Sequence, residues 1–140
     1  MATPRILIVD DDRTLLDLLR VHLSSGGLKV EVAEDAAIAI RSVLDSPPDI
    51  ILLDVQMPYL NGLDMLAALK SEPATRPIPV IVLTGEEDPH CRTKALKLGA
   101  DGFLNKPVQY RQLINEIFSR LARRAAEKAR AAREQEKPEE

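Results

Sequence analysis

Ile6-Leu7-Ile8-Val9 is followed directly by Asp10-Asp11-Asp12, and this change from an apolar run to three carboxylates decides the fold. The run is apolar throughout and does not alternate with polar residues, which is typical of a strand buried on both faces of a parallel sheet. Parallel strands need crossover connections, usually helices. The segment therefore predicts an α/β protein with an acidic cluster just past its first strand.

Three later segments repeat this pattern of a buried run followed by a polar residue. They are Ile50 to Leu53 before Asp54, Val80 to Leu83 before Thr84, and Phe103 to Asn105 before Lys106. In an open parallel sheet, ligands bind outside the carboxyl ends of the strands, so these side chains should converge at one edge. The carboxylates would repel one another there unless they were protonated or bound a hard cation, and Mg²⁺ suits such a site.

Strand-like and helix-like runs alternate along the chain, which predicts a parallel sheet with helices on both faces. Asp12 is placed to cap the first helix and Gly99 to end the fourth. The predicted strands span 5–9, 28–33, 49–53, 78–83 and 102–104, and the predicted helices span 12–24, 35–44, 61–70, 89–98 and 109 onward.

Composition excludes several classes of function. The net charge of -3 and the 3% aromatic content argue against binding to nucleic acid. The single Cys91 suits a reducing compartment. No apolar stretch has the length of a membrane span, and the N-terminus leaves no room for a signal peptide before the first strand. We expect a cytoplasmic protein with no membrane partner and no direct contact to nucleic acid.

The last helix changes character after Leu121, where its large apolar residues end. Residues 123–136 are mainly alanine and charged residues, which form a helix readily but have little to bury. The basic residues there are followed directly by acidic ones, so a solvated helix face is favoured over a nucleic-acid contact. We predict a folded domain at 1–122 and a polar helical extension at 123–140 with a partly disordered tail.

Four motifs in this order resemble the receiver (response regulator) domain of two-component signal transduction. They are Val9-Asp10-Asp11, Asp54-Val55-Gln56-Met57-Pro58 with Gly62 four residues on, Leu83-Thr84-Gly85, and the run from Gly99 to Pro107. The resemblance covers Arg5 to about Leu121. It implies a flavodoxin-like, doubly wound, five-stranded parallel sheet of order 2-1-3-4-5 with helices on both faces.

The resemblance also implies a role for each matching residue. Asp54 corresponds to the phosphoacceptor, which forms an acyl phosphate. Mg²⁺ would be bound by Asp11, by Asp54, by the backbone carbonyl of Gln56 and, through water, by Asp10. Lys106 would supply the compensating cation, and a cis peptide bond would join it to Pro107.

A conformational switch and its partners are implied as well. Thr84 corresponds to the switch hydroxyl and Phe103 to the switch aromatic residue. The phosphoryl donor would be a sensor histidine kinase, and the chain would catalyse only its own phosphorylation and dephosphorylation. Output would run to a downstream protein through the face of the fourth helix, fifth strand and fifth helix, which is also a candidate homodimer interface.

Two other interpretations remain open at this stage. A haloacid-dehalogenase-type phosphatase begins with Asp-x-Asp-x-Thr after a buried strand, which occurs here from Asp10 to Thr14. That family needs an acidic pair after the lysine, and only Glu116 lies between Lys106 and the extension. The second alternative is a binding module that does not use phosphorylation, but such chains usually lack the acceptor, an acidic residue or the lysine, and all are present here.

Overall fold

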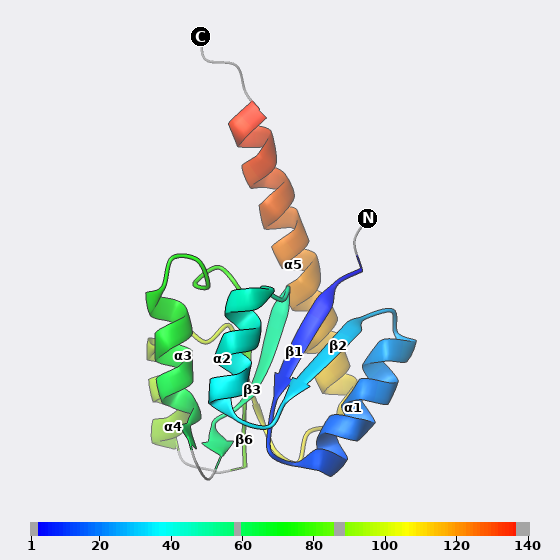
Figure 1. Ribbon diagram of the computed structural model, residues 1–140, viewed down its shortest axis with the longest axis vertical. Coiled ribbons are helices and arrows are strands. Elements are labelled where there is room, and N and C mark those ends of the chain that lie inside the picture. Colours follow the sequence, from blue (N-terminus) through cyan, green and yellow to red (C-terminus); the bar gives the residue numbers. More distant parts are fainter. Residues whose placement is uncertain (1–2, 58–59, 86–88, 137–140) are drawn as a thin grey trace.

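The computed structural model describes residues 3–57, 60–85 and 89–136, and it has a five-stranded parallel sheet with helices on both faces (Figure 1). The strands of this sheet are β1 (Arg5–Val9), β2 (Lys29–Ala33), β3 (Ile50–Asp54), β6 (Val80–Thr84) and β7 (Gly102–Asn105). The helices are α1 (Arg13–Ser25), α2 (Ala36–Asp45), α3 (Gly62–Ser71), α4 (Pro89–Lys97) and α5 (Tyr110–Glu136). The sheet order is β2-β1-β3-β6-β7, so the predicted order 2-1-3-4-5 is confirmed.

The sheet separates two hydrophobic core clusters. The first cluster joins one face of the sheet to α2, α3 and α4, and the second joins the other face to α1 and α5. Every residue of β3 and β6 is buried, as their unbroken apolar runs predicted. Fully burying an Ile or Leu side chain stabilises a fold by roughly 1.5–3 kcal/mol, so these two central strands hold the rest of the domain in place.

The first helix begins at its predicted cap, Asp12, and the second has a cap, Asp35, that was not predicted. Asp12 Oδ1 accepts a hydrogen bond from the Leu15 backbone N at 3.2 Å, and Asp35 Oδ1 accepts one from the Ile38 N at 2.8 Å. Each cap residue has extended backbone, so each of these helices starts one residue after its predicted boundary. Gly99, with φ of +103°, follows α4 as predicted.

A short hairpin after β3 was not predicted. β4 (Gln56–Met57) and β5 (Leu60–Asn61) form an antiparallel pair. Strands of two residues are too short to produce a recognisable alternation in the sequence. The hairpin returns the chain so tightly that a Cβ on Gly62 would lie 2.4 Å from the Val55 Cα, so α3 can begin beside the end of β3 only with glycine at this position.

A network of hydrogen bonds joins α3 to the sheet at the edge where the parallel strands begin. The Lys70 Nζ at the end of α3 donates hydrogen bonds to Asp101 Oδ2 at 3.0 Å, to the Ile78 carbonyl at 2.9 Å and to the Arg76 carbonyl at 3.1 Å. Asp101 Oδ2 also accepts a bond from the Val80 N at 2.8 Å. This network ties the end of α3 to the first residues of β6 and β7.

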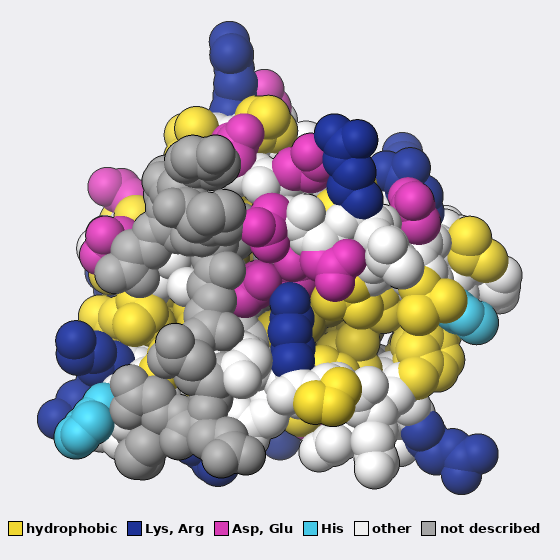
Figure 2. Space-filling model, turned by 90° about the horizontal axis from the view of Figure 1, so that it is seen from below, with side chains coloured by type: hydrophobic (Ala, Val, Ile, Leu, Met, Phe, Trp, Pro, Cys, Tyr) yellow, Lys and Arg dark blue, Asp and Glu magenta, His cyan; other side chains and the backbone are white. Residues whose placement is uncertain are grey.

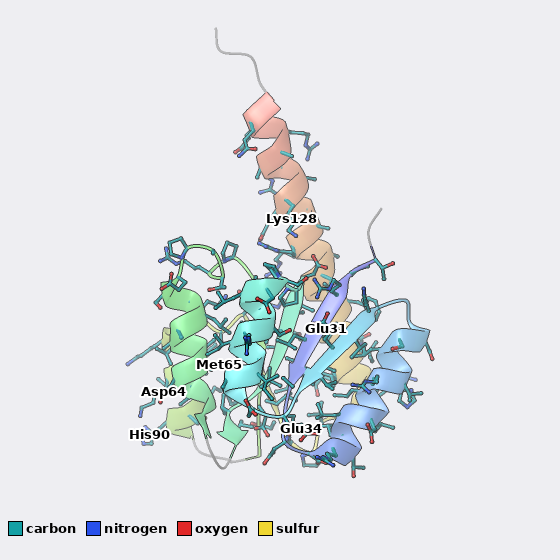
Figure 3. All side chains as sticks on the ribbon, viewed as in Figure 1. Glu31, Glu34, Asp64, Met65, His90 and Lys128 are labelled. Carbon is teal, nitrogen blue, oxygen red and sulfur yellow. The ribbon has the colours of Figure 1, made fainter. Side chains whose placement is uncertain are left out.

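Helix α5 is 27 residues long and extends beyond the sheet (Figure 1). Its apolar residues Leu113, Ile117 and Leu121 are buried in the second core cluster. Two long side chains further on reach back to the body, with Arg124 Nη1 2.9 Å from the Pro77 carbonyl and Lys128 Nζ 3.3 Å from Asp49 Oδ1. Figure 3 shows Lys128 at the place where α5 leaves the body. The extension is therefore held at its base by polar contacts that its alanine-rich sequence did not predict.

Among the described residues, none of the helices combines the length and the apolar character that a membrane crossing requires.

Candidate functional site

Four polar residues lie at the carboxyl edge of the sheet because each follows or ends a parallel strand. Asp10 comes directly after β1, Asp54 ends β3, Thr84 ends β6, and Lys106 comes directly after β7. The strand register pairs Asp54 with Leu83 and Thr84 with Asn105, so the four strands end at nearly the same height. Figure 2 looks onto this edge and shows acidic side chains gathered beside a basic one. The predicted convergence of these residues is thus present in the fold.

Three carboxylates form the centre of the site. Asp10, Asp11 and Asp54 each offer an oxygen, and these oxygens lie within 4.8 Å of one another. Asp10 is 1% and Asp54 3% exposed, whereas Asp11 is exposed to solvent. A half-open set of hard oxygen donors fits a cation that keeps several of its water molecules, as Mg²⁺ does. The residues present therefore fit the predicted metal.

Lys106 bridges the two buried carboxylates. Its Nζ lies 2.9 Å from Asp10 Oδ2 and 3.0 Å from Asp54 Oδ2, and its side chain is 24% exposed. The Lys106 backbone N donates to the Thr84 carbonyl at 2.6 Å, and the peptide bond to Pro107 is cis, as expected. The contact with Asp10 was not predicted, because the two residues are 96 positions apart and only the strand order brings them together.

Burial and charge shift the protonation of this pair. Burial raises the pKa of Asp10 above its ordinary value, although the hydrogen bond from Lys106 and the backbone bond from Asp12 oppose the rise. Burial alone would lower the pKa of Lys106, but hydrogen bonds to Asp10 and Asp54 outweigh it and raise this pKa. The ammonium is therefore retained and pairs with two of the three clustered carboxylates, and the remaining negative charge favours a bound cation.

Asp12 does not belong to the acidic cluster. Its side chain caps α1, as predicted, and the described carboxylates that gather at the site are Asp10, Asp11 and Asp54. The phosphatase alternative requires the second aspartate of its motif, Asp12, to face the site. The geometry therefore disfavours that alternative.

The two predicted switch residues lie on one face of the sheet. Thr84 is fully buried, and Phe103 is partly buried against the first core cluster. Phe103 pairs with Val82, and side chains two residues apart in a strand share a face, so Thr84 and Phe103 are diagonal neighbours. The backbone of Gln56 lies in β4 just after Asp54, while Pro58 of the same motif lies outside the described residues.

One residue near the switch pair was missed in the sequence. The Arg92 guanidinium on α4 lies over the Phe103 ring, with its Cζ 5.6 Å from the ring centroid. An arginine on an exposed helix position has no distinguishing local signal, so only the packing of α4 on β7 shows this contact.

Comparison with known proteins gives the same picture. The family model described as the response regulator receiver domain matches residues 6–118. The transcriptional regulatory protein CpxR of Escherichia coli is 44% identical over 119 residues, which are 85% of this chain and 50% of CpxR. The transcriptional regulatory protein PrrA of Mycobacterium tuberculosis is 36% identical over 126 residues, which are 90% of this chain and 53% of PrrA. The chain thus spans about half the length of the curated relatives it matches.

The fold comparison agrees with the family match. A CheY-like response regulator receiver domain protein from Methanospirillum hungatei has a TM-score of 0.83 and 31% identity, covering 90% of this chain and 99% of that one. The family model, the relatives and the sheet order all describe the same domain. The chain therefore belongs to the response regulator receiver domain family.

Proposed function

We propose that the chain is a phosphoacceptor that receives a phosphoryl group from a sensor histidine kinase on Asp54. The observation that carries this proposal is the position of the Asp54 carboxylate. It ends a central strand, lies within the acidic cluster and has Lys106 Nζ 3.0 Å from its Oδ2. A buried carboxylate that ends a central strand between an ammonium and a candidate metal site is suited to attack on phosphorus.

In the proposed reaction an Asp54 oxygen forms a bond to phosphorus as the bond to the donor histidine nitrogen breaks. When bound, Mg²⁺ would neutralise charge on the carboxylates and on the phosphoryl oxygens. Asp11, Asp54 and the Gln56 carbonyl would hold it, with Asp10 acting through water. Hydrolysis of the acyl phosphate later restores Asp54, so the chain acts only on itself.

Two further residues complete the proposed chemistry. Lys106 compensates the charge on the phosphoryl oxygens, and the Thr84 hydroxyl donates a hydrogen bond to them. Phosphoryl transfer depends mainly on such positioning and electrostatic stabilisation, so these groups need no further catalytic residue.

The surface beside Lys106 supports docking of the kinase. Leu18 and Val21 on α1 are 50% and 64% exposed. A largely apolar recess of about 260 Å³ lies between α1 and the start of α5, with Leu15, Val108 and Tyr110 among its lining residues. Figure 2 shows hydrophobic side chains exposed next to the acidic site. Exposed apolar surface often marks a protein-binding site, so this surface next to Asp54 is suited to bind the kinase that delivers the phosphoryl group.

Output is proposed to run through the face formed by α4, β7 and α5, where Phe103 lies. A change at Thr84 and Phe103 would alter this face for a downstream protein or for a second copy of the chain. CpxR and PrrA are named transcriptional regulatory proteins, and about half of each lies outside the match. We propose that the receiver domain itself contacts no nucleic acid.

The proposed domain boundary gives one prediction. Ending the chain after residue 122 removes the contacts of Arg124 and Lys128, both made at the surface. We expect the free energy of unfolding to fall by about 1 kcal/mol or less, because exposed ion pairs and hydrogen bonds contribute little. Urea denaturation of the full chain and of the shortened chain measures this. A shortened chain that fails to fold would place the extension within the domain.

Intact mass after incubation with acetyl phosphate and Mg²⁺ tests the proposed function. Wild type should gain one phosphoryl group, and Asp54→Ala should gain none. Loss of the adduct in Asp10→Ala but not in Asp54→Ala would favour the phosphatase. No adduct on wild type, with acetyl phosphate or with a phosphorylated kinase, would favour a phosphorylation-independent binding module.

A further inference from the structure

The Phe103 ring lies between the first core cluster and a cation. On its inner side the ring packs against the cluster under α3 and α4, and on its outer side the Arg92 Cζ lies 5.6 Å from the ring centroid. A guanidinium at this distance is attracted to the negative face of an aromatic ring. Two different interactions thus hold the ring at the surface of the domain.

The contact between Arg92 and Phe103 is made by a residue of α4 that does not pack in the core. Ala95 is the buried residue of α4 and Cys91 is partly buried, whereas Arg92 is exposed. Among the described residues, no carboxylate forms an ion pair with Arg92. Because Arg92 is exposed and Ala95 supplies the buried contact, replacing the guanidinium should not disturb the packing of α4.

The register of β6 and β7 couples the ring to the phosphorylation site. Val82 pairs with Phe103, so Thr84 lies diagonally next to the ring on the face that α4 covers. A Thr84 side chain that moves toward a phosphoryl group on Asp54 leaves space on the inner side of the ring. A ring that moves into this space gives up its contact with Arg92.

We infer that Arg92 is a positioning residue that holds Phe103 in the resting form and so sets how readily the domain switches. The inference rests on the proposed function, since it takes Thr84 and Phe103 as the switch pair. Because Arg92 stabilises only the resting position of the ring, its removal should make the phosphorylated form easier to reach. This effect on switching depends on the contact between the arginine on α4 and the phenylalanine on β7.

Titration with beryllofluoride and Mg²⁺, followed by NMR, tests this inference, because beryllofluoride imitates a phosphoryl group on a carboxylate. Arg92→Met keeps a long side chain and good helix propensity but removes the charge. We expect it to increase the affinity for beryllofluoride about two- to fivefold, the size of an exposed cation–π contact. Arg92→Lys, which keeps a cation, should give a smaller increase.

The control is to make Arg92→Met in a protein that already carries Phe103→Leu. Arg92→Met should have no further effect on affinity when the ring is absent. The NMR signals of the Arg92 δ protons give a second readout, because the ring should shift them upfield in wild type. This shift should disappear in Phe103→Leu and when beryllofluoride binds.

The outcomes separate the two proposals. If wild type does not bind beryllofluoride or accept a phosphoryl group, the proposed function is wrong and the switch role of Arg92 is lost with it. If wild type binds and Arg92→Met binds equally well or more weakly, only the role of Arg92 is wrong. An equal effect of Arg92→Met with and without the Phe103 ring would also overturn that role.

Discussion

Replacing Lys106 by methionine is expected to slow phosphorylation of Asp54 by about 100-fold or more. Removing one preorganised group that stabilises charge in a transition state typically has an effect of about this size. Lys106 Nζ lies 3.0 Å from Asp54 Oδ2 in a pocket with three carboxylates, so no other described side chain is placed to replace its charge. Mass spectrometry of the acetyl phosphate reaction over time measures the rate.

The same substitution should also destabilise the domain without metal. Asp10 and Asp54 would remain buried without their shared ammonium, and breaking a buried ion pair is costly. We expect the free energy of unfolding at pH 7 to fall by about 2–3 kcal/mol, with Mg²⁺ restoring part of the loss. Lys97→Met, at an exposed position on α4, is the control and should change little. A Lys106→Met protein as stable as wild type would show that the carboxylates need no such partner.

Asp10→Asn is expected to gain stability relative to wild type as the pH rises, in the absence of metal. Burial raises the folded-state pKa of Asp10 above the ordinary aspartate value of 3.8, so the folded state disfavours the charged carboxylate. Asparagine has nearly the shape of the neutral acid, and its Oδ1 can still accept the hydrogen bond from the Asp12 N. Its amide nitrogen takes the place of the Oδ2 that pairs with Lys106, so the substitution removes that contact. The substitution should also weaken Mg²⁺ binding and phosphorylation, because it removes a carboxylate from the acidic cluster.

The pH dependence of this difference follows from the direction of the pKa shift. A raised carboxyl pKa means that the folded state binds more protons than the unfolded state, so wild type loses stability as pH rises from 3.8 through the folded-state pKa. The stability of Asp10→Asn relative to wild type should therefore rise as the pH goes above 3.8 and level off above the folded-state pKa of Asp10. Urea denaturation of both proteins across this range measures it. If the stability of Asp10→Asn relative to wild type rises as the pH falls, burial of the Asp10 carboxylate is not the cause.

Sequence alone predicted the architecture and the polar residues that meet at the carboxyl edge of the sheet. The apolar run before Asp10 and the run before Asp54 are buried strands, because segments without alternation need cover on both faces. Parallel strands place their carboxyl ends at one edge, so the residues after them had to meet. The cap Asp12 could be predicted because capping is a local interaction between a side chain and the next turn.

Only the tertiary structure decided the contacts between elements that are distant in the chain. The bridge from Lys106 to Asp10, the cation over Phe103 and the anchors of α5 at Arg124 and Lys128 all join separate elements. Periodicity reports which face of an element is buried, but it does not report which partner a long polar side chain reaches. That choice depends on the packing of whole helices and strands. The sequence therefore determined which polar residues meet at the carboxyl edge, and the tertiary structure decided which of their charges form ion pairs.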